Sequence, residues 1–225
     1  MRFMTPRKLF FDRADAGQQL AERLARYGPQ QPIVLALPRG GVAIGFEVAK
    51  KLGALLDVLV ARKLGAPGNP EFGIGAIAEG GIMLLNQKEI PLLGIKQEEM
   101  EDLVAKESAE MERRIRLFRG NRHNPQVSGR VVILVDDGLA TGVTARAAIE
   151  SLRLAKPAKL VFAVPVCAKE SSAALKSLVD ELVCLYEPED FIAVGEWYED
   201  FPQLSDEEVV RLLDEARETI QGAKP

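Results

Sequence analysis

The stretch ILVDDGLATGVTARAAI, residues 133–149, decides the fold. An apolar run ends at Val135, two acids follow at once, and a loop rich in glycine and threonine leads into a helical pattern. Two adjacent carboxylates at a strand end repel each other, so a cation or a group of hydroxyls should meet them. The stretch therefore predicts a buried strand, a polar ligand loop and a helix N-terminus.

Strands and helices alternate on both sides of this stretch. The strands are expected over 33–37, 55–62, 131–135, 160–166 and 181–186, the helices over 16–27, 42–53, 97–119, 143–155, 169–179 and 205–220, and a hairpin over 74–85 that turns at Gly80 and Gly81. This order predicts the α/β class, a doubly wound, mostly parallel five-stranded sheet with helices on both faces. We expect a single domain over 1–225, with a core over about 15–186 and a small C-terminal hood over about 187–225.

Composition narrows the class of protein. The 225 residues are 47% hydrophobic and 28% charged, which suits one globular domain. A net charge of -4 argues against a broad nucleic-acid or membrane surface but allows a local anion site.

The N-terminal segment lacks the apolar stretch of a signal peptide, so a cytoplasmic location is expected. Cys167 and Cys184 lie in apolar runs and are expected to be free buried thiols rather than a structural disulfide.

Two of the expected strands, 33–37 and 131–135, end in glycine loops. Ligands of doubly wound sheets bind outside the carboxyl ends of the strands, where the strand order reverses. We therefore expect these two loops to be spatial neighbours that flank the site.

The loop after the acids has two chemical halves. Its glycines, the hydroxyls of Thr141 and Thr144 and the backbone amides of a helix start suit a phosphate. Asp136 and Asp137 cannot bind that phosphate, but they can accept hydrogen bonds from two vicinal hydroxyls or help to hold a divalent cation. A 5-phosphorylated ribose offers both features a few ångströms apart.

The motif VILVDDGLATGVT resembles the diphosphate-sugar signature of the type I phosphoribosyltransferases, and the whole chain looks like a group of them without an assigned base. The resemblance implies that Asp136 and Asp137 hold the ribose hydroxyls, that Ala140 to Thr144 wrap the 5-phosphate, and that Mg²⁺ is the cofactor. The two acids would hold the metal mainly through ligand or water. Hypoxanthine-type members have an acid where this chain has Ala140, so a general base at that position does not carry over.

The loop LPRGG, 37–41, resembles the pyrophosphate loop of the same family, for which Gly40 and Gly41 allow a strained peptide and Arg39 supplies a cation. Arg62 and Lys63 resemble the basic residues that reach the same diphosphate, although a solvated strand end is the alternative. The full set expected to bind 5-phosphoribosyl 1-diphosphate is Arg39, Gly40, Gly41, Arg62, Lys63, Asp136, Asp137, Gly138, Ala140, Thr141, Gly142, Val143 and Thr144.

Residues 64–82 occupy the position of the family's flexible loop, which closes over the reacting centre. Glu71 and Glu79 in this segment could act on the incoming base or be exposed loop charges. Near the C-terminus, EDFIAVGEWYEDF resembles the purine-type hood only loosely. Phe191 and Trp197 are candidates for stacking on the base and Val194 for a backbone contact, and the alternative is that these side chains form the hood's core.

The leading hypothesis is an enzyme that transfers the phosphoribosyl group to a nitrogen base and releases pyrophosphate, with Arg39, Asp136 and Asp137 as its catalytic residues. The alternatives are a non-catalytic sensor of phosphoribosyl ligands on the same fold and, through GIGAIA, a nicotinamide-dependent oxidoreductase. Small-molecule substrates are the expected partners, a homo-oligomer stays open, and no nucleic acid or membrane partner is expected.

A cluster of arginines closes the expected helix over 97–119. Its members are Arg113, Arg114, Arg116, Arg119 and Arg122. A solvated face that complements the helix dipole is favoured over nucleic-acid contact.

Overall fold

The computed structural model describes residues 8–222, without the side chains of Glu71 and Gln221. Its centre is a five-stranded parallel sheet in the order β2-β1-β6-β7-β8. The strands are β1 (Ile33–Ala36), β2 (Leu55–Val58), β6 (Val131–Val135), β7 (Lys159–Val166) and β8 (Glu181–Tyr186). The predicted α/β class, the five strands and their parallel pairing are confirmed.

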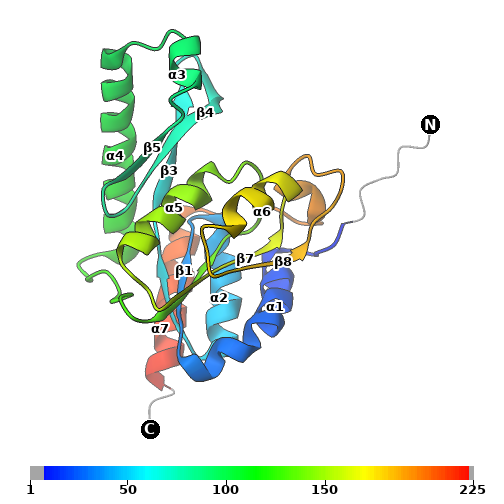
Figure 1. Cartoon of the computed structure of the whole chain (residues 1–225). Coiled ribbons are helices and arrows are strands. Elements are labelled where there is room, and N and C mark those ends of the chain that lie inside the picture. The colour runs from blue at the N-terminus through cyan, green and yellow to red at the C-terminus, as the bar shows by residue number, and fades with distance from the viewer. Residues whose placement is uncertain (1–7, 223–225) are drawn as a thin grey trace, which may run out of the picture.

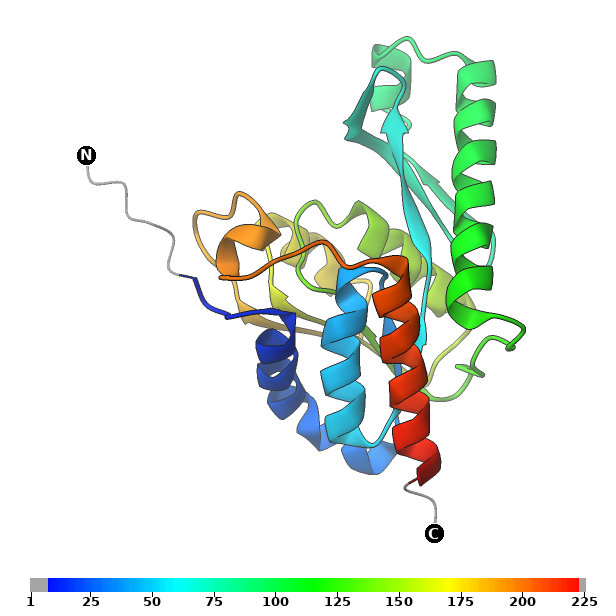
Figure 2. The same ribbon diagram turned by 180° about the vertical axis from the view of Figure 1, so that it is seen from behind.

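Helices cover both faces of this sheet. On one face lie α1 (Arg13–Leu24), α2 (Gly40–Leu52) and α7 (Asp206–Gly222), which Figure 2 shows side by side. On the other face lie α5 (Val143–Leu154) and α6 (Lys169–Lys176), which face the viewer in Figure 1. Helix α1 begins earlier than expected because the Asp12 side chain accepts a hydrogen bond from the amide of Asp15 and caps it.

The strands have no polar alternation because both of their faces are buried. Val34 and Ala36 of β1 pack with α1, α2 and α7, whereas Ile33 and Leu35 pack with α5 and α6. Each strand therefore contributes to two separate hydrophobic clusters, as expected for a parallel sheet between two helix layers.

Residues 61–119 form an arm that projects from the sheet (Figure 1). It consists of a second, antiparallel sheet of β3 (Ala61–Ala66), β4 (Asn69–Ala78) and β5 (Ile82–Leu85), with α3 (Glu89–Leu92) and the long α4 (Gln97–Arg119). The arm has its own small core, centred on Leu64, Ile74 and Ile77. The hairpin turn at Gly80 and Gly81 is confirmed, but the single strand predicted over 55–62 is wrong. That run divides between the two sheets.

A buried ion pair fixes the foot of the arm. Arg119 is 2% exposed, and its Nη1 donates to Glu79 Oε2 at 2.8 Å while its Nη2 donates to the Val58 carbonyl at 2.7 Å. Asp57 is a further partner, with its Oδ1 3.4 Å from Arg119 Nε. Two expectations are therefore wrong: Glu79 is not an exposed loop charge, and the arginine cluster is not wholly solvated, because Arg119 compensates the charge of buried acids.

The segment expected to be the hood contributes to two regions. Residues 187–205 run along the carboxyl edge of the sheet and include the short 3₁₀ helix η2 (Val194–Trp197). Helix α7 instead packs on α2, with Val209 and Leu213 in the main core. A capping box holds its start, since Ser205 N donates to Glu208 Oε2 at 2.7 Å and Glu208 N donates to Ser205 Oγ at 3.2 Å.

Within residues 8–222, none of the helices combines the length and the apolar character that a membrane crossing would need.

Candidate functional site

The reversal of strand order lies between β1 and β6. Ala36 pairs with Val135, and the amide of Leu37 donates to the Val135 carbonyl at 3.0 Å. The chain leaves both strands at the same edge of the sheet, so the loops that follow them are neighbours, as predicted. This edge is where doubly wound sheets bind ligands.

Two glycines allow the loops to touch. A Cβ atom on Gly40 would lie 1.8 Å from Asp137 Oδ2, and one on Gly41 would lie 2.9 Å from the Val135 carbonyl oxygen. Any side chain at either position would collide with the acid-bearing segment. The peptide bond between Pro38 and Arg39 in this loop is cis.

Arg39 lies just before α2, and its side chain is directed toward the start of α7. Its Nη1 is 3.7 Å from Asp206 Oδ1, and Arg113 Nη2 of the arm donates to Asp206 Oδ2 at 3.2 Å. Asp206 therefore forms ion pairs with both arginines. These pairs connect the Arg39 loop to the start of α7 and to α4 of the arm.

Arg13 is a site residue that the sequence analysis missed. Its Nε donates to Asp137 Oδ2 at 2.8 Å, its Nη1 donates to the Pro202 carbonyl at 2.7 Å, and its guanidinium lies 3.7 Å over the ring of Phe201. It therefore connects α1, the acid pair and the segment before α7. The signal was a basic residue at the start of a helix whose buried face is otherwise apolar, but the sequence alone did not indicate its partner.

The two acids differ in their surroundings. Burial and the neighbouring Asp137 charge raise the pKa of Asp136 well above its usual range. Burial also raises the pKa of Asp137, although the Arg13 guanidinium opposes this shift. Asp136 Oδ1 accepts a hydrogen bond from the amide of Asp137 at 2.9 Å, and Tyr198 donates its hydroxyl to the Asp137 carbonyl at 2.6 Å. Hydroxyl donors or a cation at this edge would stabilise the charged form of the pair.

The loop from Gly138 to Gly142 is held at its base and open at its tip. Leu139 lies beside Cys167, accepting a hydrogen bond from the amide of Ala168 at 2.8 Å and donating to the Val166 carbonyl at 2.9 Å. The Ser171 hydroxyl donates to the Ala140 carbonyl. The loop ends at Gly142, whose φ of 73° lies in the left-handed region that favours glycine.

Helix α5 begins at Val143 without a side-chain cap. Thr141 is exposed, and Val143 and Thr144 are partly exposed. The first amides of the helix and these hydroxyls are therefore suited to an anionic group.

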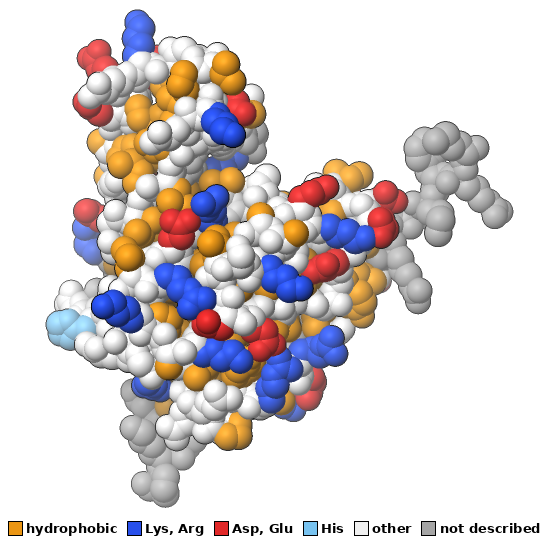
Figure 3. Space-filling view, in the orientation of Figure 1, with side chains coloured by type: hydrophobic (Ala, Val, Ile, Leu, Met, Phe, Trp, Pro, Cys, Tyr) orange, Lys and Arg blue, Asp and Glu red, His pale blue; other side chains and the backbone are white. Residues whose placement is uncertain are grey.

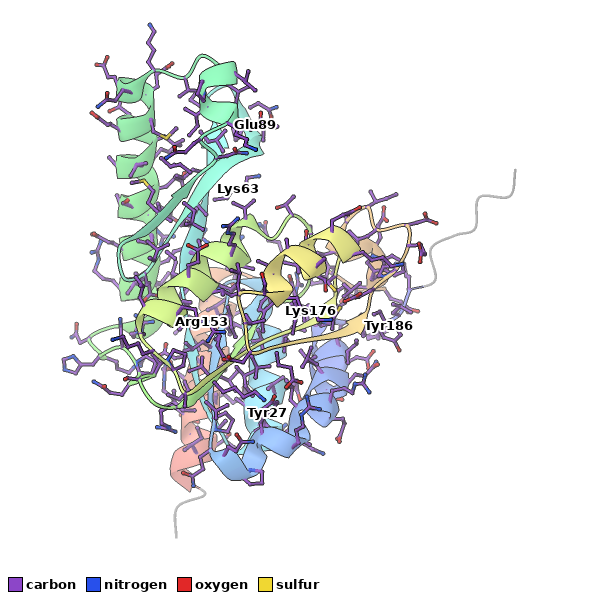
Figure 4. The ribbon with its side chains drawn as sticks, viewed as in Figure 1. Tyr27, Lys63, Glu89, Arg153, Lys176 and Tyr186 are labelled. Atoms are coloured by element: carbon purple, nitrogen blue, oxygen red, sulfur yellow. The ribbon has the colours of Figure 1, made fainter. Side chains whose placement is uncertain are left out.

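Arg62 and Lys63 lie on β3, in the arm. Arg62 Nη2 donates to Glu107 Oε2 of α4 at 2.6 Å. The described residues around the adjoining hollow come from β3, the β3–β4 turn, the start of β4 and α4. Figure 4 shows Lys63 at the foot of the arm, near the notch above α5. The structure thus places Arg62 in an ion pair within the arm, and its contact with a diphosphate stays a prediction.

A hollow lies between the arm and the body, beside the start of α5. A hollow of about 570 Å³ is lined by β4 and β5 on one side and by Val143 and Arg146 of α5 on the other. In the space-filling view the arm stands clear of the body above this region (Figure 3). The depression therefore adjoins the start of α5.

Of the three candidates for base binding, Val194 lies against the loop that follows the acids, and the other two pack on each other. Trp197 is 8% exposed and packs parallel to Phe191, with ring centroids 6.5 Å apart. Val194 lies against Gly138, where an added Cβ would be 2.4 Å from Val194 Cγ1. Trp197 belongs to the main core, and its buried indole Nε1 has no hydrogen-bond partner among the described residues.

The donor set at the acids suits Mg²⁺. This ion prefers carboxylate oxygens, keeps several waters and takes its remaining ligands from substrate phosphates. Asp136 and Asp137 supply hard oxygen donors, and burial raises the pKa of both carboxyl groups, so a cation beside them would stabilise their charged forms. The residues present therefore fit the ion.

Comparisons with known proteins identify the family of the chain. The sequence profile of the phosphoribosyl transferase domain family matches residues 11–199. Two Mycobacterium tuberculosis proteins, from strains CDC 1551 and H37Rv, are each 46% identical over 216 residues and carry provisional names as phosphoribosyl transferases. The alignment covers 96% of this chain and 49% of each relative, so the chain spans about half the length of these curated relatives.

Solved structures give the same result for the fold. TT1426 from Thermus thermophilus is 43% identical, with a TM-score of 0.77 over 92% of this chain and 98% of that chain. A Neisseria gonorrhoeae protein crystallised with bound ppGpp has a TM-score of 0.51 at 12% identity, over 99% of this chain and 100% of that chain, which shows a likeness of fold alone. Because the family profile spans most of the chain, and close relatives in sequence cover nearly all of it, this chain belongs to the phosphoribosyl transferase domain family.

Proposed function

We propose that this protein binds 5-phosphoribosyl 1-diphosphate with Mg²⁺ and transfers the phosphoribosyl group to a nitrogen base, releasing pyrophosphate. The observation that carries the proposal is the contact between two loops at the reversal of strand order. The Arg39–Gly41 loop lies directly against Asp136 and Asp137, and the uncapped start of α5 follows them.

Each part of the ligand has a matching group on the protein. The 5-phosphate would bind the loop from Ala140 to Thr144 and the first amides of α5. The ribose hydroxyls would donate to the acid pair, and these hydrogen bonds would favour the charged carboxylates, whose pKa values burial raises. The diphosphate would bind at the Arg39–Gly41 loop, whose glycines bring its backbone directly against the acids.

The reaction needs no covalent nucleophile from the protein. The base nitrogen forms a bond to the anomeric carbon while the bond from that carbon to the diphosphate oxygen breaks, and the electron pair leaves with pyrophosphate. The protein would hold the two reactants in line and stabilise charge on the leaving group through Arg39 and backbone amides. Mg²⁺, when held by Asp136 and Asp137 through ligand or water, would supply further positive charge to the diphosphate.

The base would bind beside the Val194 segment. Val194 lies against Gly138, so a group recognised by backbone atoms here would lie next to the sugar. Phe191 is partly buried and is the candidate for stacking, whereas Trp197 supports Phe191 from the core.

The test is turnover. The protein is incubated with the sugar diphosphate, Mg²⁺ and a panel of purine and pyrimidine bases, and pyrophosphate and nucleotide are measured together. Asp136→Asn should lose most activity, whereas the matched change Asp102→Asn, at an exposed position on α4, should retain it. Equal activity in both variants would show that the acids at the end of β6 are not involved.

A binding measurement distinguishes the enzyme hypothesis from the sensor hypothesis. Calorimetric titration with the sugar diphosphate should give affinity that Thr141→Ala weakens, because the variant lacks one hydroxyl donor to the phosphate. Tight binding without nucleotide formation across the whole panel would favour the regulatory alternative. No binding at all would refute both.

A further inference from the structure

The only two cysteines in the sequence lie side by side in the fold. Cys167 follows β7 directly, Cys184 lies in the neighbouring edge strand β8, and their sulfur atoms are 2.6 Å apart. Neither residue takes part in the proposed transfer. Figure 4 shows the carboxyl end of β8, marked by Tyr186, at the outer side of the sheet.

The sulfur contact favours a bond over a metal. Two thiolates around a tetrahedral Zn²⁺ lie about 3.8 Å apart, since each Zn–S bond is about 2.3 Å. A disulfide requires about 2.05 Å, which is closer to the contact observed. Glu187 is a third potential metal ligand, but its Oε1 accepts a hydrogen bond from the Ser172 hydroxyl at 2.8 Å and lies 3.6 Å from Cys167 Sγ.

The two thiols differ in access to solvent. Cys167 is fully buried, and its contact with Cys184 together with burial raises the pKa of its thiol. Cys184 is partly exposed at the edge of the sheet. A soluble oxidant would therefore reach Cys184 first, and Cys167 would be the second sulfur to react.

The pair is also connected to the loop that follows the acids. Leu139 is hydrogen-bonded to the residues on both sides of Cys167, to the Val166 carbonyl at 2.9 Å and from the Ala168 amide at 2.8 Å. A disulfide between Cys167 and Cys184 would link residues 166–168, which hold Leu139, covalently to β8.

We propose that Cys167 and Cys184 form a modification site, a dithiol that peroxide converts reversibly into an intramolecular disulfide. Peroxide oxidises the Cys184 thiol to a sulfenic acid, and one water is released. The Cys167 sulfur then attacks the Cys184 sulfur, the S–S bond forms, the S–O bond breaks, and the hydroxyl leaves as a second water with the Cys167 proton. A dithiol reductant supplies the two electrons and two protons that restore both thiols.

The test uses the reduced full-length chain and hydrogen peroxide. We expect the loss of both free thiols, a non-reduced peptide that joins Cys167 to Cys184, and full recovery of the thiols with dithiothreitol. Persistence of both thiols would overturn the proposal, as would a sulfinic acid at Cys184 with Cys167 still free. One equivalent of tightly bound zinc in the purified protein would also overturn it in favour of a metal site.

Two single variants test the order of the steps. In Cys167→Ser, a sulfenic acid should accumulate at Cys184 and be trapped by dimedone. In Cys184→Ser, the buried Cys167 should give no adduct under the same conditions. Equal trapping in both variants would refute the order.

Hydrogen exchange tests the connection to the loop without reference to activity. The amides of Leu139 and Ala168 should exchange more slowly in the oxidised protein, while those of the distant α4 should not change. Unchanged exchange at Leu139 would show that the disulfide does not influence the loop.

Discussion

Replacing Arg13 with methionine should destabilise the protein strongly at neutral pH. The side chains of Arg13 and Asp137 are 10% and 17% exposed, with Nε and Oδ2 2.8 Å apart. Removing one partner of a buried pair costs about 3–5 kcal/mol because the remaining charge is left uncompensated. Methionine retains most of the aliphatic volume, so the loss should come mainly from charge and from the contacts with Phe201 and the Pro202 carbonyl.

The pH dependence of stability distinguishes the electrostatic contribution of Arg13 from its packing contribution. Without Arg13, the pKa of Asp137 in the folded protein should rise further, because the guanidinium is the group that opposes the effect of burial. An acid with a raised pKa in the folded state binds its proton more tightly there than in the unfolded chain, so stability is lost as the pH rises from about 4, the usual Asp value, through the raised value. The difference between the two proteins should therefore be largest at neutral pH. Near pH 4 it should fall to about 1–2 kcal/mol, the range expected for the lost cation–π contact and hydrogen bond.

Urea denaturation at both pH values measures this difference. The matched control is Arg23→Met, at an exposed position on the same helix, which should change the free energy of unfolding by less than about 0.5 kcal/mol. An equal loss for Arg13→Met at both pH values would refute the electrostatic explanation and indicate that Arg13 acts through packing.

Three further changes test other contacts. Arg119→Met should cost about 3–5 kcal/mol in urea denaturation because it leaves Glu79 buried without its cation, and an unchanged midpoint would contradict this role. Gly138→Ala should cost about 1–3 kcal/mol through overlap with Val194, and adding Val194→Ala should recover part of that loss in thermal unfolding. If the second change gives no recovery, the overlap is not the cause. Tyr198→Phe should cost about 0.5–1.5 kcal/mol by removing a hydroxyl donor, and a urea midpoint equal to that of the parent would show that this bond does not contribute.

Local patterns predicted the body of the fold well. The run that ends at Val135 is apolar at every position because helices cover both faces of β6, and this can be read from the sequence without knowing its neighbours. The adjacency of the two glycine loops followed from a general rule about parallel sheets. The acids, the loop after them and the loop around Gly40 were found in this way, while their roles toward a ligand stay predictions.

Contacts between distant residues were not predictable in the same way. Arg13 and Asp137 are 124 positions apart, and Arg119 and Glu79 are 40 apart. An arginine at a helix end has the same local pattern whether it faces water or a buried carboxylate. The arm was incompletely predicted for a related reason, since the run over 55–62 continues without a turn signal although it changes sheets after Val58.

The anchoring of the arm restricts how that part of the protein can bend. At its foot, Arg119 is bonded inside the body, and the amide of Glu79 donates to the Val60 carbonyl at 3.2 Å. Above this point the pairing of β3 with β4 is regular as far as Leu64 and then shifts register twice, on either side of Gly65. The irregular part of this pairing therefore lies beyond Leu64, where Gly65 packs so closely on the Pro70 backbone that an added Cβ would lie 2.3 Å from its carbonyl oxygen.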